Sequence, residues 1–117
     1  MSANDDADDG SGAGDERVDA GILLSERETE EGLLVAVCDA DLLGETFEDG
    51  RVSLTVNEEF YGGEAASEDA VIASLKRAKT ANLVGEHAIE TAVEAGVIDP
   101  GAVLDVDGTR HAQMVRI

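Results

Sequence analysis

The sequence predicts one α+β domain in which a mixed or antiparallel β-sheet carries two helices packed on one face. Three observations indicate this class: strand-like segments lie at both ends of the domain, two helical stripes lie between them, and the 117 residues are 43% apolar. That apolar fraction is enough for one small core. The order strands, helix, helix, strands favours helices gathered on a single face of the sheet.

Residues 1–20 are expected to lie outside this domain. They hold seven acids and one base, with almost no bulky apolar side chain. Such a segment cannot repay the entropy that it loses on ordering. We therefore predict a disordered acidic tail over residues 1–20 and a single folded domain over residues 21–117.

The folded domain is predicted to begin with strands. Residues 22–24 and 33–38 are expected to pair as a hairpin, and 33–38 is apolar throughout, which indicates a central strand buried on both faces. Residues 39–44 favour a short helical turn. Residues 51–56 alternate between apolar and polar side chains, which predicts a further strand. Its inward side chains are expected to be Val52, Leu54 and Val56.

Two helices are predicted next. Ser67 is the expected N-cap of the first helix, whose first turn is acidic and whose apolar residues recur at helical spacing. The second helix is expected over residues 83–95, with Asn82 as its N-cap and Gly96 just beyond its end. Residues 103–117 then form a C-terminal hairpin around an Asp-Gly turn.

The net charge of -19, from 27 acids and 8 bases, excludes a nucleic-acid-binding protein of the usual basic kind. Lysine occurs only twice, and residues 21–117 alone carry 20 acids against 7 bases. This balance favours adaptation to a salt-rich cytoplasm, where the Debye length falls to about 3 Å and self-repulsion is screened. The single cysteine fits a reducing cytosol. Because no apolar run reaches the ~18 residues of a membrane helix and no signal peptide opens the chain, we expect a soluble cytoplasmic protein.

Four clusters of residues contain polar side chains or glycines that a hydrophobic core does not require. They are Val37-Cys38-Asp39 with Leu42-Leu43-Gly44 and Phe47, then Phe60-Tyr61-Gly62-Gly63, Ala81-Asn82-Leu83-Val84-Gly85 and His111-Ala112-Gln113. In this order and spacing they resemble the archaeal family of domain of unknown function number 424, over residues 22–117. The resemblance implies a small, single-domain archaeal protein with no established activity, in a family associated with translation and ribosome-related functions. The acidic residues 1–20 depart from the compact pattern of that family.

Cys38, at the end of the predicted central strand, is a candidate nucleophile, with His111 as its base and Asn82 or Asp39 as the group that orients the base. A reactive thiolate needs a base within about 3 Å or a depressed pKa, and it needs access. The strand position favours the alternative, in which Cys38 is a small buried hydrophobe.

The candidate metal ligands are Cys38, His87, His111 and Asp39. No CxxC, HxxxH or EF-hand spacing is present, and zinc sites use closely spaced ligand pairs. We therefore expect no metal and no cofactor. We expect His87 to be a surface imidazole on the second helix.

Lys76, Arg77 and Lys79 form the one segment in which the charge changes sign, and they include both lysines of the chain. Cations at a helix C-terminus complement the helix dipole, which explains one or two of them. Their clustering favours an anion-binding patch for RNA phosphates or an acidic partner, with residues 80–85 adding backbone N–H donors at a helix N-terminus. Three phosphate contacts give a salt slope of roughly -2.7, which removes on the order of 3.5 log units of affinity between 0.1 and 2 M salt. RNA binding must therefore also use stacking, hydrogen bonds or a preassembled partner.

Aromatic and amide side chains are candidates for such contacts. Tyr61 is a candidate stacking platform, whereas Phe60 is expected to anchor its glycine-rich loop onto the core. His111 and Gln113 share one face of the last strand, where they form either a buried hydrogen-bonded pair or a small binding surface.

The sequence thus favours a non-catalytic binding protein that contacts RNA or a ribosome-related assembly through residues 76–85. The alternative is a small thiol-dependent enzyme that uses Cys38 and His111. The predicted binding residues are Lys76, Arg77, Lys79, Asn82, Tyr61, His111 and Gln113.

Overall fold

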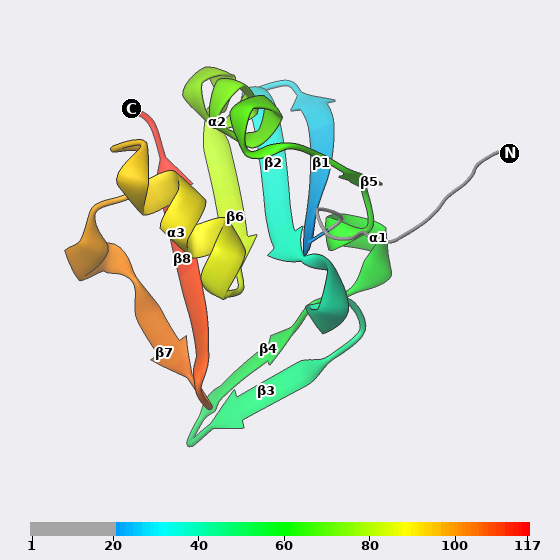
Figure 1. Cartoon of the computed structure of the whole chain (residues 1–117), viewed down its shortest axis with the longest axis vertical. Coiled ribbons are helices and arrows are strands. Elements are labelled where there is room, and N and C mark those ends of the chain that lie inside the picture. The colour runs from blue at the N-terminus through cyan, green and yellow to red at the C-terminus, as the bar shows by residue number, and fades with distance from the viewer. Residues whose placement is uncertain (1–20) are drawn as a thin grey trace, which may run out of the picture.

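The computed structural model describes residues 21–117 and confirms the predicted α+β class. The described chain forms a six-stranded mixed sheet and a separate two-stranded hairpin (Figure 1). The acidic tail predicted for residues 1–20 lies outside the described residues. No helix within residues 21–117 has the length and apolar character to cross a membrane.

The first two strands form the predicted hairpin. β1 (Ile22–Thr29) and β2 (Gly32–Asp39) pair antiparallel along their whole length. β2 is buried on both faces over residues 35–38, as expected for a central strand. The 3-10 helix η2 (Ala40–Leu42) follows, where the sequence predicts a short helical turn.

A small hairpin comes next, formed by β3 (Thr46–Asp49) and β4 (Val52–Thr55). The sequence predicts that Val52 and Val56 face inward. This prediction is confirmed for Val56, which is fully buried, and is wrong for Val52, which is 54% exposed. Val52 is the first residue of β4 and pairs with Asp49 beside the turn of the hairpin. Two short elements that the sequence did not predict follow: α1 (Glu58–Tyr61) and β5 (Glu64–Ala65).

The first long helix, α2 (Glu68–Arg77), begins as predicted. The hydroxyl oxygen of its N-cap, Ser67, accepts a hydrogen bond from the backbone N–H of Ala70 at 3.1 Å. Its apolar stripe is set by the helical period, and Val71 and Leu75 are fully buried.

The segment after α2 differs from the prediction. Residues expected to start the second helix form β6 (Thr80–Val84) instead, so Asn82 lies within a strand and is not an N-cap. β6 runs parallel to β2, and this non-local pairing outweighs the local helical pattern. The helix α3 (Glu86–Glu94) begins after Gly85, whose φ of 112° permits the sharp change from strand to helix. The order is therefore strands, helix, strand, helix, strands.

The C-terminal hairpin is confirmed. The 3-10 helix η3 (Pro100–Ala102) leads into β7 (Leu104–Val106), which pairs antiparallel with β8 (Thr109–Val115). The two turn residues, Asp107 and Gly108, have φ values of 53° and 82°. Positive φ at both positions is the requirement of a tight hairpin turn that follows the twist of the strands.

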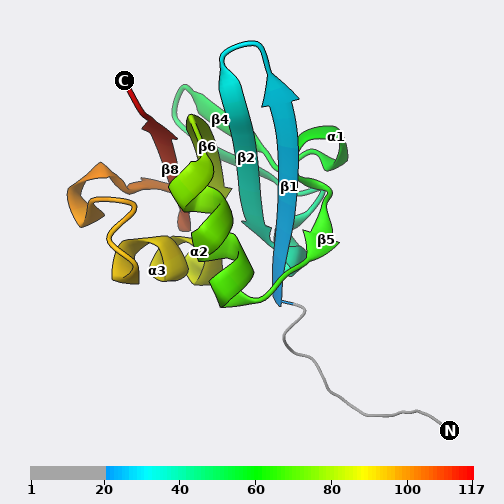
Figure 2. The ribbon, with the colours of Figure 1, turned by 90° about the horizontal axis from the view of Figure 1, so that it is seen from above.

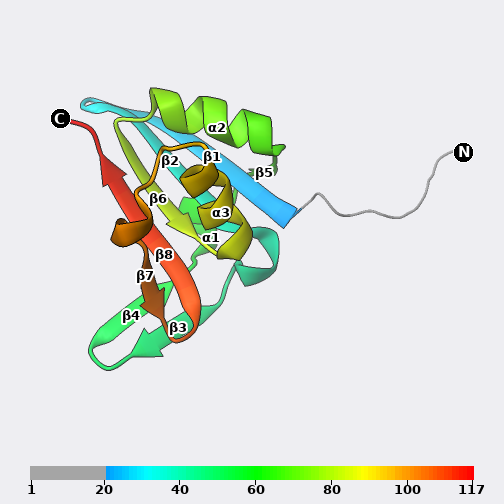
Figure 3. The ribbon, with the colours of Figure 1, turned by 60° about the vertical axis from the view of Figure 1, so that its left-hand side comes forward.

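The main sheet has the strand order β5-β1-β2-β6-β8-β7. Only the β2–β6 pair is parallel among these neighbours, which makes the sheet mixed. Figure 2 shows α2 and α3 on one side of the strands, and α1 and β4 on the other. Figure 3 shows β3 beside the end of β7, and both strands of the small hairpin contact β7.

Side chains alternate between these two faces along each strand. On the helix face, strand residues such as Val35, Val37 and Leu83 pack against α2 and α3 in the larger core. On the opposite side, here called the hairpin face, a smaller core joins the strands to α1 and the β3–β4 hairpin. Its buried members are Ala36, Cys38, Val56, Tyr61 and Val84.

Candidate functional site

The strand register arranges the side chains of the hairpin face in three rows that cross the sheet. The first row is Arg27, Leu34, Thr80 and Val115. The second row is Ser25, Ala36, Asn82 and Gln113. The third row is Leu23, Cys38, Val84, His111 and Leu104. None of these residues is acidic, although the chain holds 27 acids.

The small core covers Cys38 and Val84 of the third row and Ala36 of the second, whereas Leu104 at the end of the third row is 60% exposed. Cys38 and Val84 are fully buried beneath it. In contrast, Gln113 is exposed and the side chain of Val115 is 64% exposed. The uncovered residues of the first two rows are here called the open sheet face. They are Ser25, Arg27, Leu34, Thr80, Asn82, Gln113 and Val115.

Two amides lie side by side at the centre of the open sheet face. Asn82 and Gln113 are register partners on β6 and β8. Within residues 21–117, neither side chain makes a hydrogen bond to another protein group, so the amides are available to a ligand. His111 is half-buried and Gln113 is exposed, and no hydrogen bond joins them, so they do not form the buried pair considered from the sequence. Asparagine is disfavoured within strands, and this fold gives Asn82 no structural role.

A narrow gap lies beside α1 at the edge of the open sheet face. It is lined by Ser25, Arg27, Leu34, Ala36 and Phe60 and is too small to admit a water molecule. A guanidinium nitrogen of Arg27 (Nη2) donates a hydrogen bond to the backbone carbonyl of Glu59 at 3.4 Å, which holds this cation against α1.

The two aromatic residues of α1 exchange their expected roles. The ring of Tyr61 is buried, and burial raises the pKa of its hydroxyl to about 12. Its ring centroid lies 4.9 Å from that of Phe60 in an edge-to-face arrangement. Tyr61 is therefore the anchor, and the half-buried Phe60 is the aromatic side chain that reaches the surface.

Cys38 and His111 share the third row but do not meet. The side chain of Val84 lies between them, and two strand spacings separate their backbones by about 10 Å. Burial, with a smaller effect of nearby carboxylates, raises the pKa of the Cys38 thiol to about 11. The sulfur instead lies 3.9 Å from the backbone oxygen of Tyr61. This arrangement provides neither the base nor the thiolate that the enzymatic alternative requires.

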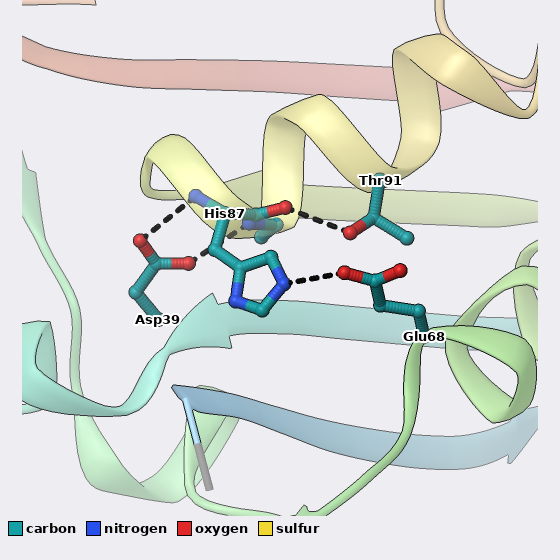
Figure 4. A network of polar contacts seen from close by, with 5 residues as sticks. Asp39, Glu68, His87 and Thr91 are labelled. Carbon is teal, nitrogen blue, oxygen red and sulfur yellow. Dashed lines mark hydrogen bonds and ion pairs between the residues drawn. The ribbon is translucent and has the colours of Figure 1, made fainter. Parts of the chain in front are cut away.

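Asp39 caps α3 from the end of β2. Its two carboxylate oxygens accept hydrogen bonds from the backbone N–H groups of His87 at 3.0 Å and Ala88 at 2.8 Å (Figure 4). A Cβ on Gly85 would lie 2.4 Å from the Asp39 carboxyl carbon, so only glycine fits at this position. Burial raises the pKa of Asp39 even though these two hydrogen bonds oppose the shift. The helix N-terminus that we expected to bind an external anion is therefore already occupied by Asp39, which also does not orient His111.

His87 is a surface residue, as expected. Its ring nitrogen Nε2 lies 2.7 Å from a carboxylate oxygen of Glu68, and its side chain is 42% exposed (Figure 4). The hydroxyl of Thr91 donates to the backbone carbonyl of His87 at 2.9 Å. In the part of the chain that the structure describes, no group of three or more His, Cys, Asp or Glu side chains is placed to hold a metal ion.

A group of cations borders the first row, where α2 ends, β6 begins and β8 ends (Figure 1). The backbone N–H of Arg116 donates to the carbonyl of Lys79 at 2.8 Å, which joins these segments. The group is here called the basic rim and consists of Lys76, Arg77, Lys79 and Arg116.

The two arginines of the basic rim have structural partners. Arg77 pairs with Glu26 at 2.8 Å, and the hydrogen bond from Ser74 together with Arg77 lowers the pKa of Glu26. Arg116 donates to the backbone carbonyls of Leu75 and Ala78, the last carbonyls of α2. It therefore caps the helix as the dipole favours.

The two lysines have no such role. Among residues 21–117, neither Lys76 nor Lys79 forms an ion pair, although the stem of Lys79 lies against Gly32. The helix-end explanation therefore accounts for the arginines and leaves both lysines available to an anion.

The structure brings only some of the predicted binding residues together. Asn82 and Gln113 meet on the open sheet face, with His111 in the next row. Lys79 directly precedes Thr80 of the first row, whereas Lys76 lies in the last turn of α2, which packs on the helix face. The sequence did not reveal four members of this surface, Ser25, Arg27, Leu34 and Val115, whereas Thr80 lies within the predicted segment 76–85. Alternation along β8 was a signal for Val115, but the register that aligns all four was not visible in the sequence.

The fold and this surface define a class: a small α+β domain whose mixed sheet is closed by helices on one face and left partly open on the other. The sequence profile of the DUF424 family, described as a protein of unknown function, matches residues 26–117. The chain belongs to this family, which confirms the resemblance seen in its four clusters.

One solved structure shares the fold. It is the crystal structure of an uncharacterized conserved protein from Methanopyrus kandleri, which is 26% identical in sequence and superposes with a TM-score of 0.68. The similarity covers 82% of this chain and 94% of that chain. No curated protein gives a significant match.

Proposed function

We propose that this protein is a non-catalytic binding protein whose open sheet face and basic rim contact RNA, either free or within a ribosome-related assembly. The observation that carries the proposal is the absence of acids from all three rows of the hairpin face in a chain of net charge -19. Elsewhere on the surface a polyanion meets carboxylates. Along these strand rows an RNA strand meets no carboxylate, whereas the exposed Glu58 and Glu59 of α1 lie on the same side of the sheet.

The number of available cations limits what charge can contribute. With Arg77 and Arg116 already engaged, Lys76 and Lys79 provide two phosphate contacts. Two contacts with a single strand give a salt slope of roughly -1.4, which removes on the order of two log units of affinity between 0.1 and 2 M salt. If the protein works in a salt-rich cytoplasm, as its acidity predicts, most of the affinity must come from contacts with bases.

The enzymatic alternative has no observation in its favour. Cys38 is fully buried and Val84 separates it from His111. A binding role needs neither group to react.

The test uses two matched substitutions of an exposed valine by glutamate. Val115→Glu places a carboxylate on the open sheet face, whereas Val52→Glu places one on the β3–β4 hairpin. Both valines are more than half exposed, and both variants change the net charge equally. Fluorescence anisotropy with labelled single-stranded and duplex RNA of mixed sequence measures the affinity of each.

We expect Val115→Glu to weaken RNA binding by about tenfold or more, because an unpaired carboxylate then faces phosphate and loses hydration on contact. Val52→Glu should change it by less than about twofold, because screening weakens charges a Debye length away. If the unsubstituted protein binds neither RNA, or if both variants lose affinity equally, the proposal is wrong.

A further inference from the structure

We propose that a basic segment of another protein binds along β1 in an extended conformation, as an added strand at the edge that β5 leaves uncovered. This inference goes beyond the proposed function, because it concerns a different surface and a protein ligand in place of RNA. Three observations carry it: backbone groups on β1 without a partner, a groove beside them, and the acids that line both.

The last part of β1 has an uncovered edge. β5 pairs only with Leu23 and Leu24, near the start of β1 (Figure 2). Residues 25–29 run on past β5, and no other strand of residues 21–117 pairs with them on this side. This segment is here called the β1 edge, and its residues 26–29 are exposed. An exposed edge is a template for pairing with another chain.

The antiparallel ladder determines where the backbone groups of the β1 edge point. Successive residues of such a strand direct their N–H and C=O groups alternately to one neighbour and to the other. The carbonyl of Ile22 accepts a hydrogen bond at 3.0 Å from the backbone N–H of Ala66, on the β5 side. Glu26 and Glu28 lie an even number of residues from Ile22, so their N–H and C=O groups also point away from β2. In the described part of the chain these four groups have no backbone partner.

A groove of about 260 Å³ lies beside the β1 edge, where β1 passes the beginning of β5. It is lined by Leu24, Glu26, Glu64, Ala65 and Ala66, and is here called the β1 groove. Leu24 and Ala66 pack against the larger core and form an apolar wall, whereas Glu26 and Glu64 contribute carboxylates. A lysine or arginine side chain lays its apolar stem on such a wall and keeps its charged end near the carboxylates and water. The β1 groove therefore fits one cationic side chain.

Acids predominate along the β1 edge, the turn that follows it and the groove. They are Glu26, Glu28, Glu30, Glu31 and Glu64. The one cation of this segment, Arg27, is turned to the hairpin face, where the carbonyl of Glu59 holds it. These acids repel RNA and also the same edge of a second copy, because like charges directly opposite each other destabilise strand pairing. A basic strand is attracted instead.

The alternation of side chains along a strand specifies the sequence pattern of the partner. The residues that face Glu26 and Glu28 lie two positions apart in the added strand and project to the same side of the sheet. Ser74 and Arg77 already engage Glu26, so the cation that faces it extends over the β1 groove toward Glu64. The next cation faces Glu28. We therefore expect lysine or arginine at alternate positions of the partner segment.

The experiment measures binding of fluorescein-labelled peptides to the full chain by anisotropy, in 0.15 M and 1 M KCl. One eight-residue peptide alternates lysine with threonine, and its isomer has all four lysines followed by all four threonines. A third peptide has the alternating sequence with N-methylated lysines, whose backbone cannot donate to β1.

Three variants of the protein remove the same charge. Glu28→Gln removes only the carboxylate, whereas Glu28→Pro also removes the outward N–H of an edge position, where proline is tolerated. Glu90→Gln removes an exposed carboxylate from α3 and is the control. Circular dichroism confirms that each variant is folded.

We expect the alternating peptide to bind at least about fivefold more tightly than its isomer, because only alternation places the lysines on one side of a strand. Glu28→Gln should weaken its binding by about two- to fivefold, and Glu90→Gln by less than about 1.5-fold. Glu28→Pro should weaken it by a further threefold or about that, because a backbone hydrogen bond is lost. N-methylation of the peptide should have at least the effect of Glu28→Pro.

Four results would overturn the proposal. Equal binding of the two isomers, or equal losses in Glu28→Gln and Glu90→Gln, indicates unspecific attraction to an acidic surface. Equal affinities of Glu28→Pro and Glu28→Gln exclude the added strand. If Glu28→Pro does not fold, the N-methylated peptide decides, and its binding as tightly as the unmodified peptide excludes the added strand. A peptide-free dimer in sedimentation velocity that Glu28→Gln stabilises shows that a second copy occupies the edge.

Discussion

The two faces of one sheet differ in what covers them. In β6, Ala81 and Leu83 point into the helix face and are fully buried by α2 and α3, whereas Asn82, between them, points to the hairpin face and is half-exposed. The helices bury the helix face, whereas the small core buries only part of the hairpin face. Buried residues such as Leu83 hold the fold, and the uncovered residues are free to bind.

The strand rows of the two faces differ in charge, although α1 and the β3–β4 hairpin on the hairpin side carry acids of their own, among them Glu48, Glu58 and Glu59. Acids such as Glu26, Glu68 and Glu86 lie on the helix side, where they pair with Arg77, His87 and Arg110. The three rows of the hairpin face contain no acid. The net charge of the chain therefore describes most of its surface but not this part of it.

The largest expected effect comes from neighbouring substitutions in β6 that act on opposite faces. Leu83→Ala should lower the free energy of unfolding by about 2–5 kcal/mol, because it leaves a cavity in a fully buried core. Asn82→Ala should change it by less than about 1 kcal/mol, because the half-buried Asn82 amide forms no hydrogen bond to another group within residues 21–117. Urea unfolding followed by circular dichroism measures both. Comparable losses in the two variants would show that the amide is structural and remove the contrast between the faces.

A smaller effect is expected from His111, at the border between the covered and the open rows. Burial lowers the pKa of His111 below its ordinary value, so the unfolded chain binds this proton more readily than the folded chain. The contribution of neutral His111 to the free energy of unfolding is fully present above the ordinary pKa of about 6.5. It is lost as the pH falls through the lower pKa of the folded state.

The urea midpoint at pH 7.5 and pH 5 measures this contribution. His111→Gln should reduce the loss of stability on acidification. His87→Gln is the matched control on the surface of α3 and should retain the loss, because it leaves His111 in place. If His111→Gln loses as much stability on acidification as the unsubstituted protein, burial of His111 does not contribute to the acid sensitivity and the prediction is wrong.

The sequence predicted the elements whose signals are local. Ser67 caps α2, Asp107-Gly108 turns the last hairpin, and alternation along β8 correctly put His111 and Gln113 on one face. These features depend on a few neighbouring residues, so they are visible in a single sequence.

The errors have a common physical cause, which is pairing between distant segments. Residues 83–93 continue an apolar pattern that fits a helix, and Asn82 has N-cap chemistry, but pairing of β6 with β2 and β8 makes this segment a strand. The N-terminus of α3 is instead capped by Asp39, which accepts a hydrogen bond from the backbone N–H of His87, 48 residues further along the chain. The candidate site itself depends on the register of four strands, which no local pattern encodes.

The most direct test of the open sheet face is an NMR titration of the 15N-labelled protein with single-stranded RNA. We predict that amide shifts concentrate at Thr80, Asn82, Gln113 and Val115, while Ala73 and Glu90, on the exposed surfaces of α2 and α3, do not move. Shifts that concentrate on α2, α3 or the β3–β4 hairpin, or a spectrum that RNA leaves unchanged, would contradict the account.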